Sequence, residues 1–478
     1  MSILVTSPIG PILFLDGVRE GRLSLSALFI AARGYVPPPI ILGDAEVHAM
    51  ALAEYDHAIA WRARFSLPAD RTSAYAWDGV SYEVAGDLTG DIRLAYVSCN
   101  GEEIADMERE GSERNAMWAR LRESYQAKPF ALMLHGGDQV YADEITLDHK
   151  LSHDWPDRKP DDPSPPALAD LRHHLREGFF ARYAAIYSTP ELAWLAARTP
   201  SLMQWDDHDI CDGWGSLHRS LTESQVGQTV FSVARESFLI FQQAAREGDL
   251  PFRFADRSGR HLGWGISAPG LRILAPDLRS ERTRDQIMGT GGWAMMTAEA
   301  LRKAEGHTLL MSSVPLLGPR LSLLEALMAV IPRMQKYEDD LRDQWQSRAH
   351  REEWQRMLKL VIQIGQRDGH HLTAISGEIH LAARAVMDLG HGLHLNQLVA
   401  SGIAHRAPPK AWAHFLGALA SLGEQPLPGH PIRIKTVPGQ SERYTAERNY
   451  LLLDRSSGTW SARWDLETSG MTKSLALC

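Results

Sequence analysis

Short apolar runs that end in glycine, acidic residues or histidine recur along most of the chain. One of them, FALMLH, covers residues 130–135 and is followed directly by Gly136, Gly137 and Asp138. A short continuous apolar run closed by turn residues is typical of a strand that is buried on both faces of a parallel sheet. Ligands bind beyond the carboxyl ends of such strands, so Asp138 stands where either a metal ligand or a helix N-cap is expected.

The same pattern predicts a mixed α/β fold, because further apolar runs alternate with helical sequence such as residues 168–196. The parallel strands are expected to carry a site along one edge of their sheet. A closing hairpin is predicted from residues 449–453 and 460–464. The other predicted strands cover residues 94–98, 202–205, 271–275, 308–311, 373–376 and 395–400.

The first 89 residues have a different pattern, which predicts a small β-sandwich-like domain. Residues 59–65 alternate between apolar side chains and arginines, as in a half-buried strand. Two further runs flank Asp78 and Gly79, a pair that favours a two-residue hairpin turn. We therefore expect an N-terminal β domain over residues 1–89 that packs against a second domain over residues 90–478, which ends in the closing hairpin.

Three segments interrupt the strand–helix alternation. Residues 149–167 are rich in proline and aspartate, which predicts a loop. Residues 333–367 read as one long helix with an apolar face that includes Trp345 and Trp354. Residues 423–440 are rich in glycine and proline and are predicted to form another loop.

Composition excludes several classes of protein. The 478 residues carry a net charge of −9, with 44% hydrophobic and 23% charged residues, so a globular protein is expected that binds neither nucleic acid nor an anionic membrane. Three cysteines are too few for a disulfide framework and indicate either a reducing compartment or thiols kept for another purpose. No basic residue precedes Arg19, and no apolar run reaches about 18 residues. The expected location is therefore the cytoplasm.

Acidic residues gather at the predicted strand ends. Residues 206–209 read DDHD and directly follow an apolar strand. Clustered carboxylates repel each other strongly where the dielectric constant is low, so a positive group must offset them. A pair of metal ions is the simplest candidate. For any one of these residues, a role as a cap or as a buried hydrogen-bond partner is the alternative.

Seven motifs follow one another in order along the chain: SCNG at 98–101, GDQVYAD at 137–143, WDDHDICDGWGS at 205–216, DLRSER at 277–282, SSVP at 312–315, DQW at 343–345 and SGEIH at 376–380. With these motifs the sequence resembles the PhoD-like alkaline phosphatases and phosphodiesterases, within the calcineurin-like metallophosphoesterase superfamily. The resemblance covers about residues 94–404 and implies an αββα sandwich.

The resemblance implies a set of site residues. A ferric ion would be held by Cys99, by Asp138 as the bridging ligand, by Tyr141 as tyrosinate, and by His380. Asp207, Asp212 and Glu378 would bind the second metal or contact its ligands. His208 would be the catalytic histidine, Arg279 would hold the phosphate, and Asp209 is expected to orient the ring of His208.

Two departures from the family pattern concern the second metal. Glu378 replaces an aspartate, and Asp212 stands where many relatives have asparagine. Thiolate and phenolate ligands favour a transition metal such as iron, whereas carboxylates suit calcium, magnesium or manganese. We therefore expect Fe³⁺ with Ca²⁺, and Mn²⁺, Mg²⁺ or Zn²⁺ as alternatives.

The predicted function is hydrolysis of a small-molecule phosphate ester by a metal-bound hydroxide at a binuclear centre. Two ions about 3.5–4 Å apart can activate water and stabilise both the attacking and the leaving oxygen. Two alternatives stay open. The same site could act on phosphotriesters or phosphonate esters, or the protein could be a non-catalytic sensor of metal or phosphoanion.

Overall fold

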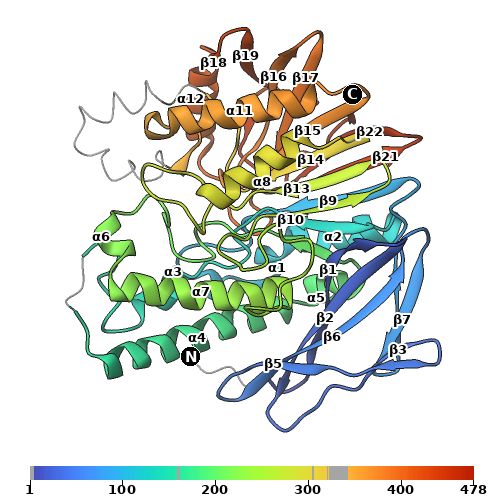
Figure 1. Cartoon of the computed structure of the whole chain (residues 1–478), viewed down its shortest axis with the longest axis vertical. Coiled ribbons are helices and arrows are strands. Elements are labelled where there is room, and N and C mark those ends of the chain that lie inside the picture. The colour runs from blue at the N-terminus through green and yellow to red at the C-terminus, as the bar shows by residue number, and fades with distance from the viewer. Residues whose placement is uncertain (1–4, 159–161, 304–305, 320, 322–342, 478) are drawn as a thin grey trace.

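The computed structural model describes residues 5–158, 162–303, 306–319, 321 and 343–477, and its framework is a pair of large sheets (Figure 1). The first sheet has eleven strands in the order β23-β22-β21-β9-β10-β11-β1-β2-β6-β5, with β24 paired to β22. These strands are β1 (Ile9–Arg19), β2 (Arg22–Ala32), β5 (Met50–Glu54), β6 (Ala58–Pro68), β9 (Ile92–Val97), β10 (Leu132–His135), β11 (Ser201–Met203), β21 (Asn449–Ser456), β22 (Thr459–Leu466), β23 (Gly470–Met471) and β24 (Leu475–Ala476).

The second sheet has nine strands in the order β12-β13-β14-β15-β17-β16-β19-β18, with β20 paired to β16. Its central strands β13, β14, β15 and β17 run parallel to one another. These strands are β12 (Trp264–Ala268), β13 (Leu271–Ala275), β14 (Gly306–Ser312), β15 (His370–Ser376), β16 (Ala382–Gly390), β17 (Leu393–Val399), β18 (Glu424–Leu427), β19 (His430–Lys435) and β20 (Tyr444–Thr445).

The two sheets pack face to face through a continuous apolar core. Leu309 and Met311 of β14 share this core with Leu94 and Tyr96 of β9, whereas Leu310 points to the opposite face of its sheet. Strands that are buried on both faces read as continuous apolar runs, which explains why the sequence pattern located them.

Helices cover the outer faces of both sheets (Figure 1). On the side of the first sheet lie α2 (Ala116–Ala127), α4 (Pro165–Tyr187), α5 (Pro190–Ala196) and α7 (Gln225–Gln243), and on the side of the second lie α8 (Thr290–Leu301), α11 (Arg351–Gly365) and α12 (Lys410–Ala420). The mixed α/β prediction is confirmed. The short helices are α1 (Gly111–Arg114), α3 (Asp143–Leu147) and α6 (Arg219–Thr222), with 3₁₀ turns at Asp106–Glu108 and Arg348–His350.

The N-terminal strands extend the first sheet, because β1 pairs in parallel with β11. A separate four-stranded sheet, β4 (Ala45–Val47), β3 (Ile40–Leu42), β7 (Ser73–Trp77) and β8 (Val80–Val84), packs on β2 and β6. The ring centroids of Phe29 and Trp77 are 5.0 Å apart across this contact. The predicted hairpin at Asp78 and Gly79 is present. The predicted boundary between residues 89 and 90 does not coincide with a break between sheets.

The structure differs from the sequence prediction in two segments. Residues 424–435, predicted to be loop, form the edge hairpin β18–β19. The prediction of one helix over residues 333–367 is wrong for residues 344–350, which form turns and a 3₁₀ turn, so that α11 begins only at Arg351; residues 333–342 lie outside the described residues. Trp354 lies on α11 and is buried, as expected. Trp345 is also buried, but it lies in the segment that precedes α11.

Candidate metal centre

The predicted site residues lie where the carboxyl ends of the parallel strands of both sheets meet. The segment after β9 is joined to the segment after β17 by cross-sheet hydrogen bonds. Ser98 Oγ donates to the Ala400 carbonyl at 3.0 Å, and the backbone N–H of Ile403 donates to the Ser98 carbonyl at 3.0 Å. These bonds hold the two rows of strand ends together at the site.

Four predicted metal ligands have a backbone conformation that is rare for residues other than glycine. Their φ angles are 56° for Cys99, 54° for Asp138, 68° for Glu378 and 55° for His380. Such left-handed residues are uncommon and cluster at functional sites. The backbone is therefore bent at four of the positions where the sequence predicts a ligand.

Gly137 allows the close approach of two acidic segments. Its φ angle is 117°, and a Cβ atom added there would lie 2.6 Å from Cβ of Asp206. No larger residue fits in this space without displacing Asp206. The glycine that precedes Asp138 thus brings Asp138 next to the segment that follows β11.

The first group of candidate ligands comprises Cys99, Asp138 and His380, whose ligand atoms all lie within 4.8 Å of one another. Cys99 Sγ is 3.5 Å from Oδ2 of Asp138. Tyr141 belongs to the same place, because its hydroxyl is 3.2 Å from Nε2 of His380. The structure therefore brings together all four residues that the resemblance assigns to one metal.

A second group comprises Asp138, Asp206 and Asp207 under the same distance limit. Asp138 belongs to both groups and lies between them. Asp207 also forms a group with His208 and Asp212, although Asp212 is exposed. Glu378 is in no such group of described residues. Its Oε1 accepts a hydrogen bond from Gln344 at 2.7 Å, and it lines the same cavity as Asp138 and Asp207.

The electrostatics of these residues fit bound cations. One carboxylate oxygen on each of Asp138, Asp206, Asp207 and Glu378 is buried without a hydrogen-bond partner among the described residues. Burial and the neighbouring Asp206 and Asp207 raise the pKa of Asp138 well above its ordinary value, and burial raises the pKa of Asp206 to about 7. Buried anions without partners are costly, so a cation at this place would stabilise the ionised forms.

The other candidate donors also suit a metal. Burial and His405 keep the pKa of His380 well below its ordinary value, so the ring is neutral and has a lone pair to donate. Burial raises the pKa values of the Cys99 thiol and the Tyr141 phenol. A metal ion is the usual means by which such groups are held as thiolate and phenolate.

The partner of His208 differs from the prediction. Its Nδ1 lies 2.9 Å from Oδ2 of Asp143, and its ring stacks on Tyr141 at a centroid distance of 4.3 Å. Burial alone would lower the pKa of His208, but Asp143 and Asp207 outweigh burial and raise it well above its ordinary value. These two carboxylates therefore favour the charged form of the ring.

Asp209 does not orient His208, because its carboxylate is used to hold the backbone. It accepts hydrogen bonds from the N–H groups of Asp138 at 2.8 Å and Asp206 at 2.9 Å, and from the side chain of Gln242 at 2.8 Å. The expected role of Asp209 is corrected accordingly. Asp209 joins the segments that carry the two groups of ligands.

Arg279 is also placed differently from the expectation. It is fully buried, and both of its terminal nitrogens donate to the carboxylate of Asp343, at 2.7 and 2.6 Å. Its Nε donates to Asp206. A guanidinium engaged in this way neutralises buried acids and does not face a substrate. The predicted contact between Arg279 and the phosphate is therefore not the role that the structure gives to this residue.

Four residues next to the site had no assigned role in the sequence prediction: Asp143, Asp206, Glu103 and His405. The ring of His405 stacks on His380 with centroids 3.4 Å apart, and its Nε2 is 3.3 Å from Oε1 of Glu103. His405 ends the segment SGIAH that follows the strand predicted at residues 395–400. The signal that pointed to the candidate ligands, a polar residue after an apolar strand, was therefore present here too.

Comparison with known proteins places the chain in a family. The model of the PhoD related phosphatases matches residues 80–338, which is more than half of the chain. The chain belongs to the PhoD related phosphatase family. The family assignment expected from the seven motifs is thereby confirmed.

Two solved structures share the fold of this PhoD related chain. PhoD itself superposes with a TM-score of 0.59 at 10% identity, covering 98% of this chain and 92% of PhoD. A purple acid phosphatase from yellow lupin (Lupinus luteus) seeds superposes with a TM-score of 0.54 at 10% identity, covering 98% of this chain and 74% of that chain. Identities this low establish similarity of fold alone.

An uncharacterized protein of Saccharomyces cerevisiae is 25% identical over 361 residues, which cover 62% of this chain. The match spans about half the length of the yeast protein, 50%. Among the described residues, none of the helices combines the length and apolar character needed to cross a membrane.

Proposed function

We propose that the protein is a metal-dependent hydrolase of phosphate esters with a binuclear centre. The observation that carries this proposal is the position of Asp138, which belongs to the Cys99–His380 group on one side and to the Asp206–Asp207 group on the other. A carboxylate shared by two groups of donors suits a bridging ligand. Family membership supports the same class of reaction.

The first metal would be held by Cys99, Asp138, Tyr141 and His380, a donor set that suits Fe³⁺. The second would be held by Asp138 and Asp207, with Asp206, Asp212 and Glu378 as further candidates, a set rich in oxygen that suits Ca²⁺, Mn²⁺ or Mg²⁺. When bound, the two cations would supply an activated water and neutralise charge on the phosphoryl oxygens. Zn²⁺ stays an alternative at either position.

His208 is proposed to act on the leaving group. Its Nδ1 is occupied by Asp143, so its Nε2 is the atom that can carry a proton toward the cavity. A charged imidazole can donate this proton to the departing oxygen or offset charge on the phosphoryl group. Asp143, rather than Asp209, positions the ring.

Phosphodiesters are proposed to be cleaved at least as well as monoesters. Arg279 faces buried carboxylates, and among the described residues that line the cavity Arg384 and the ring of His208 supply the positive charge apart from the metals. A monoester dianion would require more positive charge beyond the metals than a diester monoanion does. The cavity therefore favours the singly charged ester.

The test is turnover of bis(p-nitrophenyl) phosphate and p-nitrophenyl phosphate by protein loaded with Fe³⁺ and each divalent ion in turn, alongside Asp138→Asn. The expected result is diester turnover that disappears, together with most bound metal, in Asp138→Asn. Turnover restricted to triesters or phosphonate esters would support the alternative substrate class. Full metal loading without turnover of any ester would support a sensor and overturn the hydrolase.

A further inference from the structure

A cavity of about 540 Å³ begins at the candidate metal centre and continues well beyond it. Asp138, Asp207 and His208 line one part of it. From there it runs beside Glu378 and Gln344 into the space between α12 and the strands β16 and β17. A phosphate group is small, so most of this volume lies outside the place that the phosphoryl group would occupy.

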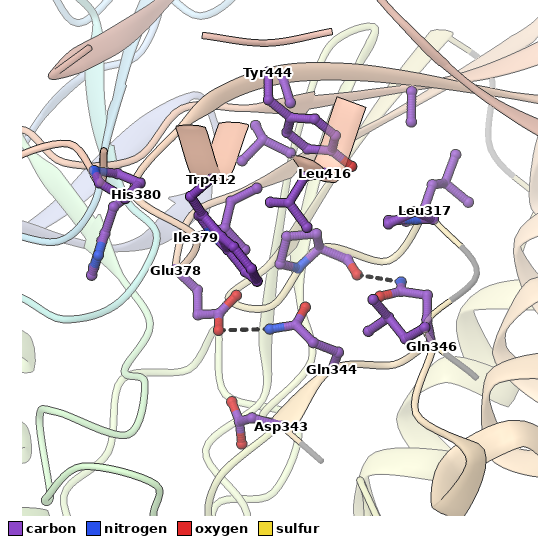
Figure 2. A pocket seen from close by; sticks show the side chains of 18 of the residues that line it. Leu317, Asp343, Gln344, Gln346, Glu378, Ile379, His380, Trp412, Leu416 and Tyr444 are labelled. Atoms are coloured by element: carbon purple, nitrogen blue, oxygen red, sulfur yellow. Dashed lines mark hydrogen bonds between the residues drawn. The ribbon is translucent and has the colours of Figure 1, made fainter. Parts of the chain in front are cut away.

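The far part of the cavity has apolar walls. Figure 2 shows Trp412, Ile379, Leu416 and Tyr444 grouped on one side of Glu378 and Gln344. Two small residues of β16, Ala383 and Ala385, line the same part and leave it open. We call this part, lined by Leu317, Ile379, Ala385, Trp412, Leu416 and Tyr444, the apolar arm.

Two amide side chains in the walls of this part of the cavity, Gln346 and Gln397, are already engaged with the protein itself. Gln346 donates to the Pro315 carbonyl at 2.9 Å. Gln397 accepts from the backbone N–H of Leu317 and donates to its carbonyl, both at 2.7 Å. A sugar or other polar group placed against these two amides would lose hydrogen bonds to water that they do not replace, which is unfavourable.

Trp412 lines the apolar arm and also reaches the surface of the protein. It lies on α12 with 40% of its surface exposed, although most large apolar side chains of the chain are buried. A partly exposed aromatic side chain in the apolar wall of a cavity is typical of a site that binds an apolar ligand group.

We propose that the apolar arm binds an apolar alkyl or aryl group esterified to the phosphate. This inference rests on the proposed function and assigns its substrate class: phosphodiesters that carry at least one bulky apolar group. The metal centre would hold the phosphoryl group while the apolar arm takes the organic group and excludes water from it. Esters of polar alcohols gain nothing from these walls.

The test compares diesters that differ only in the group for the apolar arm. Methyl hexyl phosphate and methyl 2-(2-hydroxyethoxy)ethyl phosphate have chains of matched length and similar leaving alcohols. With metal-loaded protein, kcat/KM for the hexyl ester is expected to be about 10- to 100-fold higher, since each buried methylene contributes several-fold to affinity. Calorimetric titration with hexylphosphonate and methylphosphonate measures the same preference as Kd, independently of turnover.

Two variants and a control locate the preference in the apolar arm. Trp412→Ala removes a wall and Ala385→Leu fills the space, so both should bring the hexyl-to-polar ratio toward one. Leu422→Ala is the matched control, because Leu422 follows α12, is 65% exposed and does not line this cavity. The control should keep both the ratio and the basal rate. Far-ultraviolet circular dichroism checks that each variant folds.

The outcomes separate the two claims. Equal kcat/KM for both esters, with normal turnover, would refute the proposed role of the apolar arm and would still support the proposed hydrolase activity. Absent turnover with a clear preference for hexylphosphonate overturns the hydrolase and leaves the apolar arm as a binding site. Absent turnover and equal phosphonate affinities overturn both. An unchanged ratio in Trp412→Ala and Ala385→Leu, with both folded, also overturns the assignment.

Discussion

Nδ1 of His208 lies 2.9 Å from Oδ2 of Asp143, and Oδ1 of the same carboxylate accepts a hydrogen bond from the backbone N–H of Asp212 at 2.7 Å. Asp143 is the first residue of α3, so this short helix fixes both the ring of His208 and the loop after it. A histidine held at Nδ1 by a carboxylate presents its Nε2 in a defined direction. The orientation of the proposed acid thus depends on α3.

The first prediction concerns His208 and Asp143. His208→Ala should keep its metals and lower kcat by about 10²–10⁴ on esters with a poor leaving group, because proton donation is lost. The loss should be smaller for nitrophenolate esters, which need no proton. Asp143→Asn should show the same leaving-group dependence with a smaller loss. Kinetics and metal analysis of both variants test this, and loss of metal in His208→Ala would instead make His208 a ligand.

The second prediction uses the two buried cysteines, Cys99 and Cys211. Ferric thiolate and phenolate absorb visible light, so protein loaded with iron should be coloured. Cys99→Ala should weaken or shift the absorption band and lower iron affinity, because it removes a proposed ligand. Cys211→Ala is the matched control and should keep the band. A colourless protein that contains only zinc would refute the iron assignment, and an unchanged band in Cys99→Ala would remove Cys99 from the ligand set.

The third prediction concerns Arg279. Arg279→Met should lower the free energy of unfolding by about 3–5 kcal/mol, because Asp206 and Asp343 would remain buried without their partner. Arg219→Met removes an exposed ion pair with Glu223 and should cost less than about 1 kcal/mol. Urea denaturation of both variants makes the comparison. If Arg279→Met is as stable as the unmodified protein but has a raised KM, Arg279 would instead contact the phosphate, as the motif predicts.

The fourth prediction concerns pH and His307, a buried residue of β14 away from the metal centre. Burial, with some help from His371 and His370, lowers the pKa of His307 to about 3, and its Nε2 is 2.9 Å from Oγ1 of Thr373. The unfolded chain binds a proton at this residue below about pH 6.5, whereas the folded chain does not. Its contribution to stability is therefore full above pH 6.5 and is lost as the pH falls toward 3.

Replacing His307 by glutamine should make stability less sensitive to acid. Between pH 7 and pH 5, the loss of unfolding free energy should be about 2 kcal/mol smaller in His307→Gln than in the unmodified protein. His394→Gln on β17, where the side chain is exposed, is the control and should leave the loss unchanged. Equal losses in His307→Gln and the unmodified protein would show that this residue is not buried in the neutral form.

The sequence located most central strands because they are buried on both faces. Residues 271–275 were predicted as a strand and form β13 with the same bounds. By contrast, residues 424–435 contain Pro426, Pro431 and Gly429, which favour a loop, yet they form β18 and β19. Pro426 is tolerated because β18 lies at the edge of its sheet, and Pro431 lies next to the start of β19. The parallel pairing of β1 with β11 joins residues far apart in the chain, and no local pattern predicts it.

The sequence also indicated which segments form the site, but not where each side chain points. The three aspartates of DDHD, residues 206–209, have the same side chain, yet Asp209 holds backbone N–H groups, Asp206 faces Arg279, and Asp207 lines the cavity. These directions depend on turns after β11 and on partners from other strands. The roles expected of Asp209 and Arg279 were therefore the ones that the structure corrected.

Tyr141 and His380 lie 239 residues apart in the chain. Tyr141 follows β10 of the first sheet, and His380 follows β15 of the second sheet. An ion held by both would be a reversible cross-link that closes a very long loop, and such closures restrict the unfolded chain strongly. Resistance to heat and to proteases would then rise and fall with metal supply. In a cell, the amount of intact protein would follow the metal that reaches it, even before any ester is cleaved.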